Sequence, residues 1–168
     1  MTRHRQASPL FLLLLVAVVL VPMIPAASGE PDATNWVARI ADMDQALQRG
    51  DAPATQAAWR EAYVAAHVSR TWSGMIAVGD AAIRASRLVG VEVSDARARR
   101  AYLTALLRAR RQGSLDGVLA AGDAFGRLGD RAVVRQALAV ATDLAERSGD
   151  GAARHRVEVF QAHWAPRT

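Results

Sequence analysis

The sequence predicts an all-α fold, namely an α-solenoid of three helix-turn-helix repeats followed by a C-terminal capping helix. The first observation behind this prediction is a pattern of apolar residues with helical spacing that ends with an aspartate and occurs three times. Self-similarity at a period of tens of residues is typical of stacked supersecondary units. The copies are Trp36, Ile40, Ala41 and Asp44, then Trp72, Ile76, Ala77 and Asp80, then Leu115, Leu119, Ala120 and Asp123.

The second observation is a stripe of alanines, spaced four residues apart, that follows each copy. Residues four apart lie on one face of a helix, and small side chains there let a neighbouring helix approach closely. One large residue beside each stripe fills the remaining gap, so we expect the stripes to be buried between helices. They are Ala58, Trp59, Ala62 and Ala66, then Ala101, Tyr102, Ala105 and Ala109, then Ala137, Leu138, Ala141 and Ala145.

The third observation is the spacing between copies. The first pattern advances by 36 and then by 43 residues, whereas the alanine stripe advances by 43 and then by 36. The basic period is therefore 36 residues, and a single insertion of seven residues explains both long steps. The insertion must lie between the two helices of the second repeat, where residues 89–93 are found.

The first 28 residues are predicted to be a secretory signal peptide. Arg3 and Arg5 precede an apolar run and then small residues, with cleavage expected after Ser28, which is the order of such signals. The alternative is an uncleaved inner-membrane anchor formed by residues 10–24, although these 15 residues are fewer than the roughly 20 that span a bilayer. Residues 29–34 are expected to be a linker, and residues 35–168 the repeat domain.

Capping residues delimit the helices of the repeat domain. Gly50 favours the left-handed geometry that ends a helix, and Asp51 can accept hydrogen bonds from the free N–H groups of the next helix. Gly129 and Asp130 repeat this pair, and Ser94 is the expected N-cap of the second helix of the second repeat. The expected helices are 35–49, 53–68, 72–88, 95–111, 115–128, 131–147 and a last one, 152–164, that matches neither pattern.

Two glycines, Gly79 and Gly122, lie at equivalent places in the middle of expected helices. Each costs about 1 kcal/mol relative to alanine in a helix interior. We therefore expect another group to approach the backbone closely at both positions.

The repeats resemble the tetratricopeptide (TPR) family, whose second helix has a small residue, an aromatic residue four later and an alanine three after that. The resemblance covers roughly residues 36–147, although the period is 36 rather than about 34 and the proline that ends each family repeat is absent. It implies a right-handed array whose first helices line a groove for a protein or peptide partner, with a polar cap at the end. The matching triplet is Ala98, Tyr102 and Ala105, with partial matches at Thr55, Trp59 and Ala62 and at Val134, Leu138 and Ala141.

The composition narrows the classes of partner and chemistry. The chain has no cysteine, which excludes disulfides, thiol nucleophiles and cysteine zinc sites, and all of its 21 cations are arginines. Without Arg3 and Arg5, the remaining 19 arginines exceed the 16 acids by only three, too weak an imbalance to indicate nucleic-acid binding. The lack of cysteine in an exported chain fits a bacterial source, and a GC-rich genome explains the abundance of Ala, Arg, Gly and Val. With the signal-like N-terminus, we expect a periplasmic or secreted protein.

The main candidate site is a row of aspartates on the first helices, each followed by a polar residue four positions later. One interpretation is a set of solvent-exposed pairs between residues four apart, worth about 0.2–0.5 kcal/mol each. The other is a charged row along the groove that grips an extended peptide. The candidate residues are Asp44, Asp80, Arg84, Asp123 and Arg127.

A second candidate is an arginine stripe on the expected helix 95–111. At 100° per residue, Arg97, Arg100, Arg108 and Arg111 fall on one side of this helix. The stripe is either an ordinary solvated edge or a contact for an anionic lipid surface or acidic partner. The second interpretation belongs to an alternative architecture, a compact helical bundle that binds the anionic envelope surface.

No residue pattern indicates catalysis. His155 and His163 are eight residues apart, so their directions on a helix differ by about 80° and they are poor joint metal ligands. No nucleophile elbow or phosphate-binding glycine loop occurs. The sequence therefore predicts a non-catalytic binding protein without cofactor or metal, and it leaves the partner and the oligomeric state open.

Overall fold

The computed structural model describes residues 35–165, and within that range the chain forms eight α-helices and no strand. The prediction of an all-α fold is thus confirmed for this part of the chain, whereas the predicted signal peptide and linker lie outside the described residues. No helix within the described range is long and apolar enough to cross a membrane. The helices are α1 (Trp36–Gln48), α2 (Ala52–Val68), α3 (Trp72–Arg84), α4 (Ser86–Val89), α5 (Val91–Arg111), α6 (Leu115–Arg127), α7 (Arg131–Ser148) and α8 (Gly151–Trp164).

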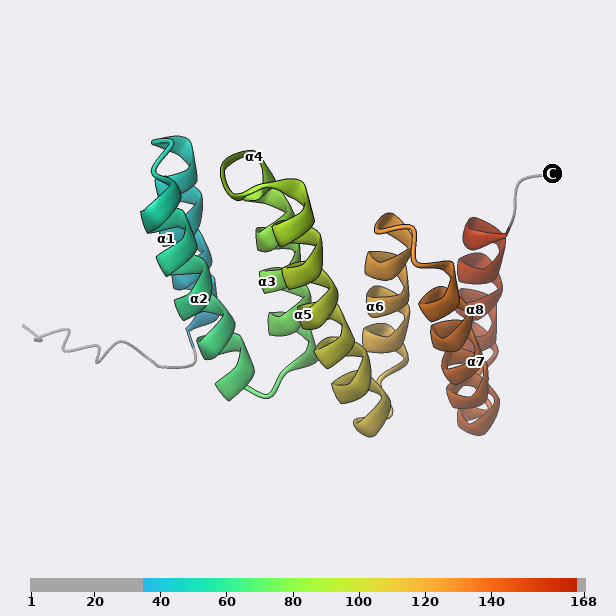
Figure 1. The fold of residues 1–168 in the computed structure, drawn as a ribbon. Helices are drawn as coiled ribbons and strands as arrows, with labels where there is room; N and C mark the ends of the chain where they lie inside the picture. The colour runs from blue at the N-terminus through green and yellow to red at the C-terminus, as the bar shows by residue number, and fades with distance from the viewer. Residues whose placement is uncertain (1–34, 166–168) are drawn as a thin grey trace, which may run out of the picture. The chain divides into compact units, whose positions relative to one another are not determined.

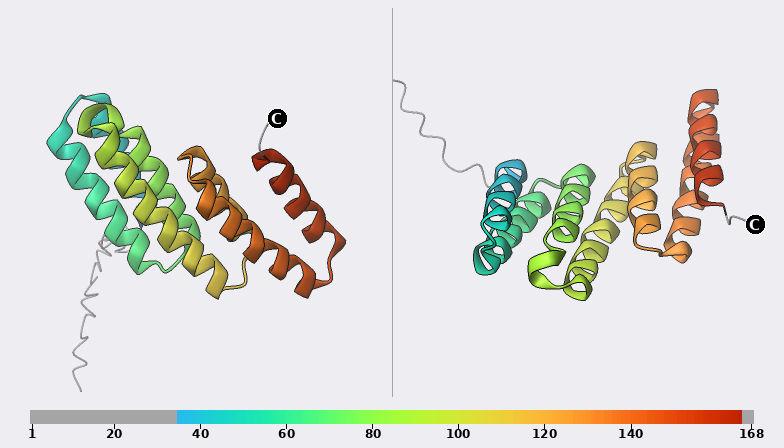
Figure 2. Two further views of the ribbon diagram at one scale, coloured as in Figure 1. Left: turned by 45° about the vertical axis from the view of Figure 1, so that its right-hand side comes forward. Right: turned by 90° about the horizontal axis from the view of Figure 1, so that it is seen from above.

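Helices that follow one another along the chain lie side by side. The most extensive contacts join α1 to α2, α3 to α5, and α6 to α7, with the short helix α4 in the turn that leads from α3 to α5 (Figure 1). Further contacts join α1 to α3, α3 to α6, and α6 to α8. Figure 2 shows α5 running beside α3 in both of its views. The first helices of successive repeats are therefore neighbours, and α8 extends their row.

The alanine stripes form the middle of the core, as predicted, except that Ala58 is only half-buried. Ala62, Ala105 and Ala141 are completely buried, and the larger Tyr102 and Phe125 are nearly so. The Tyr102 and Phe125 rings meet edge to face at 6.0 Å between centroids, a geometry worth about 0.5–1.5 kcal/mol beyond burial. Small side chains thus bring the helices together, and single large ones fill the spaces between them.

The two mid-helix glycines have the close neighbours that their sequence positions predict. A β-carbon added at Gly79 would lie 2.2 Å from a ring carbon of Tyr102. At Gly122 it would lie 2.7 Å from Phe160 and 2.9 Å from Ala137. In both places an aromatic ring therefore packs directly against the helix backbone.

The N-caps show that α8 continues the repeat, which the sequence interpretation missed. The side chains of Asn35, Thr71, Ser114 and Asp150 accept hydrogen bonds from the first turns of α1, α3, α6 and α8. These four residues are separated by 36, 43 and 36 positions, which is the spacing of the repeat. The last helix lacks the apolar pattern of the others but occupies the place of a fourth first helix.

The second repeat differs from the expected boundaries. The helix expected to reach Leu88 ends at Arg84, and α5 begins at Val91, before the expected start. Ser94 is therefore not an N-cap: it lies inside α5, fully buried, and its hydroxyl has no hydrogen-bond partner among the described residues. The seven inserted residues form α4 and an extra turn of α5, so that the former cap position becomes helix interior.

One residue adopts a backbone conformation that side chains disfavour. Among the described residues Arg70, just after α2, is the one non-glycine with a positive φ, of 56°. At the equivalent positions after α5 and α7 the chain has Gly113 and Gly149, with φ of 64° and 68°. The left-handed conformation costs an L-residue roughly 1–2 kcal/mol, so Arg70 carries a local penalty that a glycine there would avoid.

Candidate functional site

Three clefts lie in succession along the helices α1, α3, α6 and α8. They have volumes of about 210 Å³ between α1 and α3, 270 Å³ between α3 and α6, and 540 Å³ between α6 and α8. We call this surface the groove face. Its lining residues include Val37, Ile40, Ala77, Asp80 and Arg84, then Ile83, Arg127 and Leu128, then Leu119, Ala120, Asp123, Arg156, Val159, Phe160 and His163.

Four of the five candidate residues of the aspartate row line the clefts of the groove face, and the fifth, Asp44, pairs with one of them. Their pairing differs from the expected one. Arg84 does not pair with Asp80, four residues before it. Instead its Nε and Nη2 donate to the two carboxylate oxygens of Asp44, at 3.1 and 3.0 Å. A two-pronged contact of this kind is favourable for arginine, and α3 packs against α1 so that the Asp44 carboxylate is within reach.

Asp80 is held by two other residues. The Tyr102 hydroxyl donates to its Oδ1 at 2.7 Å, and Arg127 donates to the same oxygen at 3.1 Å. Arg127 also pairs with Asp123, so this expected pair, four residues apart, is confirmed. Partial burial disfavours the charged form of Arg127, but Asp80 and Asp123 outweigh it and raise the pKa of its guanidinium. The aspartates are thus partners in bonds between α3, α5 and α6.

A third link between neighbouring first helices was not predicted. Arg156 on α8 pairs with Asp116 on α6. The two residues are 40 positions apart, the same separation as Asp44 and Arg84. This recurring separation is a signal in the sequence that could have revealed the link.

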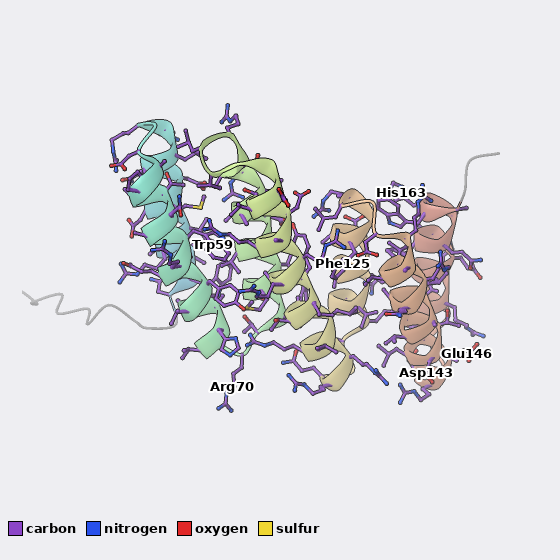
Figure 3. All side chains as sticks on the ribbon, viewed as in Figure 1. Trp59, Arg70, Phe125, Asp143, Glu146 and His163 are labelled. Carbon is purple, nitrogen blue, oxygen red and sulfur yellow. The ribbon has the colours of Figure 1, made fainter. Side chains whose placement is uncertain are left out.

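Together these pairs give the groove face its chemical character. The carboxylates of Asp44, Asp80 and Asp123 are 37–41% exposed, so each retains a solvent-facing edge while it is paired. Between them lie apolar side chains, and the cleft between α6 and α8 has Leu119 and Phe160 in its wall. Figure 3 shows His163 at one end of α8, beside this cleft. The surface therefore offers depressions with apolar residues in their walls. They are separated by the neutral Asp44–Arg84 pair and by Arg127, whose single charge is shared by two aspartates.

The tyrosine that binds Asp80 predicts a change of stability at alkaline pH. Burial raises the pKa of the Tyr102 phenol, and the hydrogen bond and negative charge of Asp80 raise it further. In the unfolded chain a tyrosine ionises near pH 10, so above that pH the unfolded state alone releases the proton. The free energy of unfolding should therefore be unaffected by this group below about pH 10 and should fall as the pH rises further.

Urea denaturation at pH 9 and pH 11 tests this expectation. The chain has no lysine or cysteine and two tyrosines, so few other groups titrate in this range. In Tyr102→Phe the contribution of Tyr102 to the alkaline decline should be absent, because no phenol remains at that position. An equally steep decline in the variant would contradict the assignment.

The four arginines of the predicted stripe on α5 have different surroundings in the structure. Arg97 stacks on Trp59, with its guanidinium carbon 4.9 Å from the ring centroid, and Arg108 is buried, with 6% of its surface exposed. Arg100 and Arg111 are exposed and take part in no ion pair among the described residues. Two of the four side chains proposed for an anionic surface are thus used inside the domain. Figure 3 shows Trp59 between α2 and α3, where its indole nitrogen donates to the Val78 carbonyl.

Arg108 closes the end of α2. Its Nη1 donates to the carbonyls of Ala66 and Thr71, both at 3.0 Å, and its Nη2 donates to the carbonyl of His67 at 2.9 Å. Carbonyls at a helix C-terminus lack partners within the helix and carry partial negative charge. Burial lowers the pKa of the Arg108 guanidinium, and the nearby Arg111 lowers it further, although arginine remains charged at neutral pH.

No group of histidine, aspartate and glutamate residues suited to a metal ion occurs within residues 35–165. His155 lies 3.6 Å from Glu158 on the exposed side of α8. The chain matches no protein-family model, no curated protein and no solved structure in the three comparisons.

Proposed function

We propose that this chain is an exported, non-catalytic binding protein that holds an extended peptide or protein segment on the groove face. The observation that carries the proposal is the succession of three clefts along α1, α3, α6 and α8. An extended peptide needs side-chain pockets at intervals and polar groups between them. The apolar depressions and the ion pairs between them meet both needs.

The architecture that we propose is a right-handed α-solenoid of TPR-like hairpins, with α8 as the capping helix. Support comes from the contacts, since each first helix touches the next one in chain order. The outward side of α8 also carries polar residues such as Arg154, Glu158 and Gln161, which suits a terminal position. Export to the periplasm or the medium rests on the signal-like residues 1–28.

Two exposed valines allow this function to be tested without disturbing the core. Val37 on α1 is 59% exposed and Val159 on α8 is 55% exposed, and both line clefts of the groove face. Peptides selected from a random display library against the purified protein serve as the probe. Val37→Asp and Val159→Asp should weaken the binding of a selected peptide by about tenfold or more, because each buries an unpaired charge under the ligand.

The matched control is Val64→Asp on α2, which is 60% exposed and lies outside the three clefts. It should leave the affinity unchanged. If no peptide is enriched, or if the control weakens binding as much as the groove variants, the groove face is not the binding surface. Asp80→Ala is unsuitable here, because it would also remove the hydrogen bond of Tyr102.

A further inference from the structure

We propose that a fourth cleft, between α2 and α5, binds a phosphate-bearing anion. This cleft has a volume of about 680 Å³ and shares no lining residue with the groove face. It lies at the turn that connects α2 to α3, where Figure 3 shows Arg70. Its lining consists of His67, Val68, Arg70, Thr104, Arg108, Arg111 and Gln112.

The cleft carries three positive charges and no carboxylate in its lining. Arg108 is the buried arginine of this cleft, and its Nη hydrogens are donated to backbone carbonyls and to His67. It therefore offers a ligand its positive charge rather than a hydrogen bond. Arg70 and Arg111 are exposed and form no ion pair with any described residue. Their guanidinium groups are therefore available to a ligand, and guanidinium binds phosphate oxygens in pairs.

Neutral hydrogen-bond donors accompany these charges. Arg108 donates to Nδ1 of His67 at 3.3 Å, because arginine has no acceptor. This contact makes Nε2 the nitrogen that bears hydrogen in a neutral imidazole. The side-chain amide of Gln112 lines the same cleft and donates one of its two hydrogens to the Arg70 carbonyl, so the other remains for a ligand. A doubly charged tetrahedral anion can use several such donors at once, whereas a single carboxylate would neutralise one charge.

The repeat itself supplies a comparison site. One repeat further on, the cleft of about 360 Å³ at the ends of α5 and α7 is lined by Gly113, Leu144 and Ser148. These residues are the counterparts of Arg70, Arg108 and Gln112, at steps of 43, 36 and 36. The lining of this comparison cleft includes two aspartates and one arginine. The cationic character is thus specific to the cleft between α2 and α5, and it includes the one arginine held in a strained conformation.

The decisive variant is Arg70→Gly, because it removes a charge of the cleft and relieves the backbone at the same time. Titration of the purified protein with inorganic phosphate, at constant ionic strength, should show saturable binding. Arg70→Gly and Arg111→Gln should each weaken it by about tenfold, which corresponds to the loss of one charge-assisted contact. The control, Arg110→Gln, removes an exposed charge of α5 outside the cleft and should change binding by less than about twofold.

Vesicles separate the two sources of a phosphate group. Co-sedimentation with phosphatidylglycerol vesicles but not with phosphatidylcholine, lost in both cleft variants, identifies a lipid headgroup as the ligand. Binding of inorganic phosphate without vesicle binding identifies a soluble phosphate compound. The proposal is overturned if neither probe binds, or if Arg110→Gln weakens binding as much as the two cleft variants, which would indicate a response to net charge alone.

Discussion

Replacing Arg108 by methionine should lower the free energy of unfolding by about 2 kcal/mol, since it removes hydrogen bonds from a charged group, which are worth about 1.5–3 kcal/mol each. The loss is limited because the Ala66 and His67 carbonyls also accept from the Ser69 hydroxyl and the Arg70 N–H. The guanidinium donates to carbonyls that end α2 and to Thr71 in the next turn. Methionine replaces the aliphatic stem but offers no donor. Urea denaturation followed by circular dichroism measures the change.

Arg110→Met is the matched control, because Arg110 lies two residues away in the same helix and is exposed. Its stability should stay within about 0.5 kcal/mol of the parent. A stable Arg108→Met variant would mean that removing the guanidinium from water costs as much as its hydrogen bonds return. In that case the hydrogen bonds of Arg108 between α5 and the end of α2 would make no net contribution to the free energy of unfolding.

Gly79→Ala should lower the free energy of unfolding by about 2 kcal/mol. The added methyl group would stand 2.2, 2.6 and 2.9 Å from three ring atoms of Tyr102. The ring cannot withdraw easily, because its hydroxyl is bonded to Asp80 at 2.7 Å. Overpacking of this kind costs about 1–3 kcal/mol or more, and the better helix propensity of alanine returns up to about 1 kcal/mol.

Gly151→Ala provides the comparison for this prediction. No heavy atom beyond its own local backbone lies within 4 Å of a β-carbon added at Gly151, in the first turn of α8. The same substitution should there be neutral or slightly stabilising. Thermal unfolding of both variants decides the matter: equal shifts would show that the Tyr102 ring accommodates the methyl group.

The sequence predicted the helices, their caps and the buried alanines because these depend on short-range spacing. Ala62 and its counterparts lie four residues from their neighbours in the stripe, and that spacing alone places them on one face. Asp51 and Asp130 were correctly identified as N-caps. The failure at Ser94 has a local cause, since nothing in residues 91–93 prevents an extra helical turn from forming before it.

The pairing within the aspartate row could not be predicted in the same way. Asp80 and Arg84 are four apart, which permits a pair within the helix, but the carboxylate of Asp44 on α1 is also within reach. Which partner is chosen depends on how closely α1 and α3 pack. By contrast, Arg70 was recognisable: aligning the repeats at 36 and 43 residues places it where glycine otherwise stands.

The ion pairs that join neighbouring first helices have a consequence for how the domain unfolds. They join residues 40 or 47 positions apart, and no side-chain hydrogen bond within residues 35–165 spans a greater distance along the chain. Each helix pair therefore depends on its immediate neighbours and on nothing further away. A domain connected in this manner can fray from either end while its middle stays folded. Hydrogen exchange should accordingly be slowest around Tyr102 and become faster, step by step, toward α1 and α8.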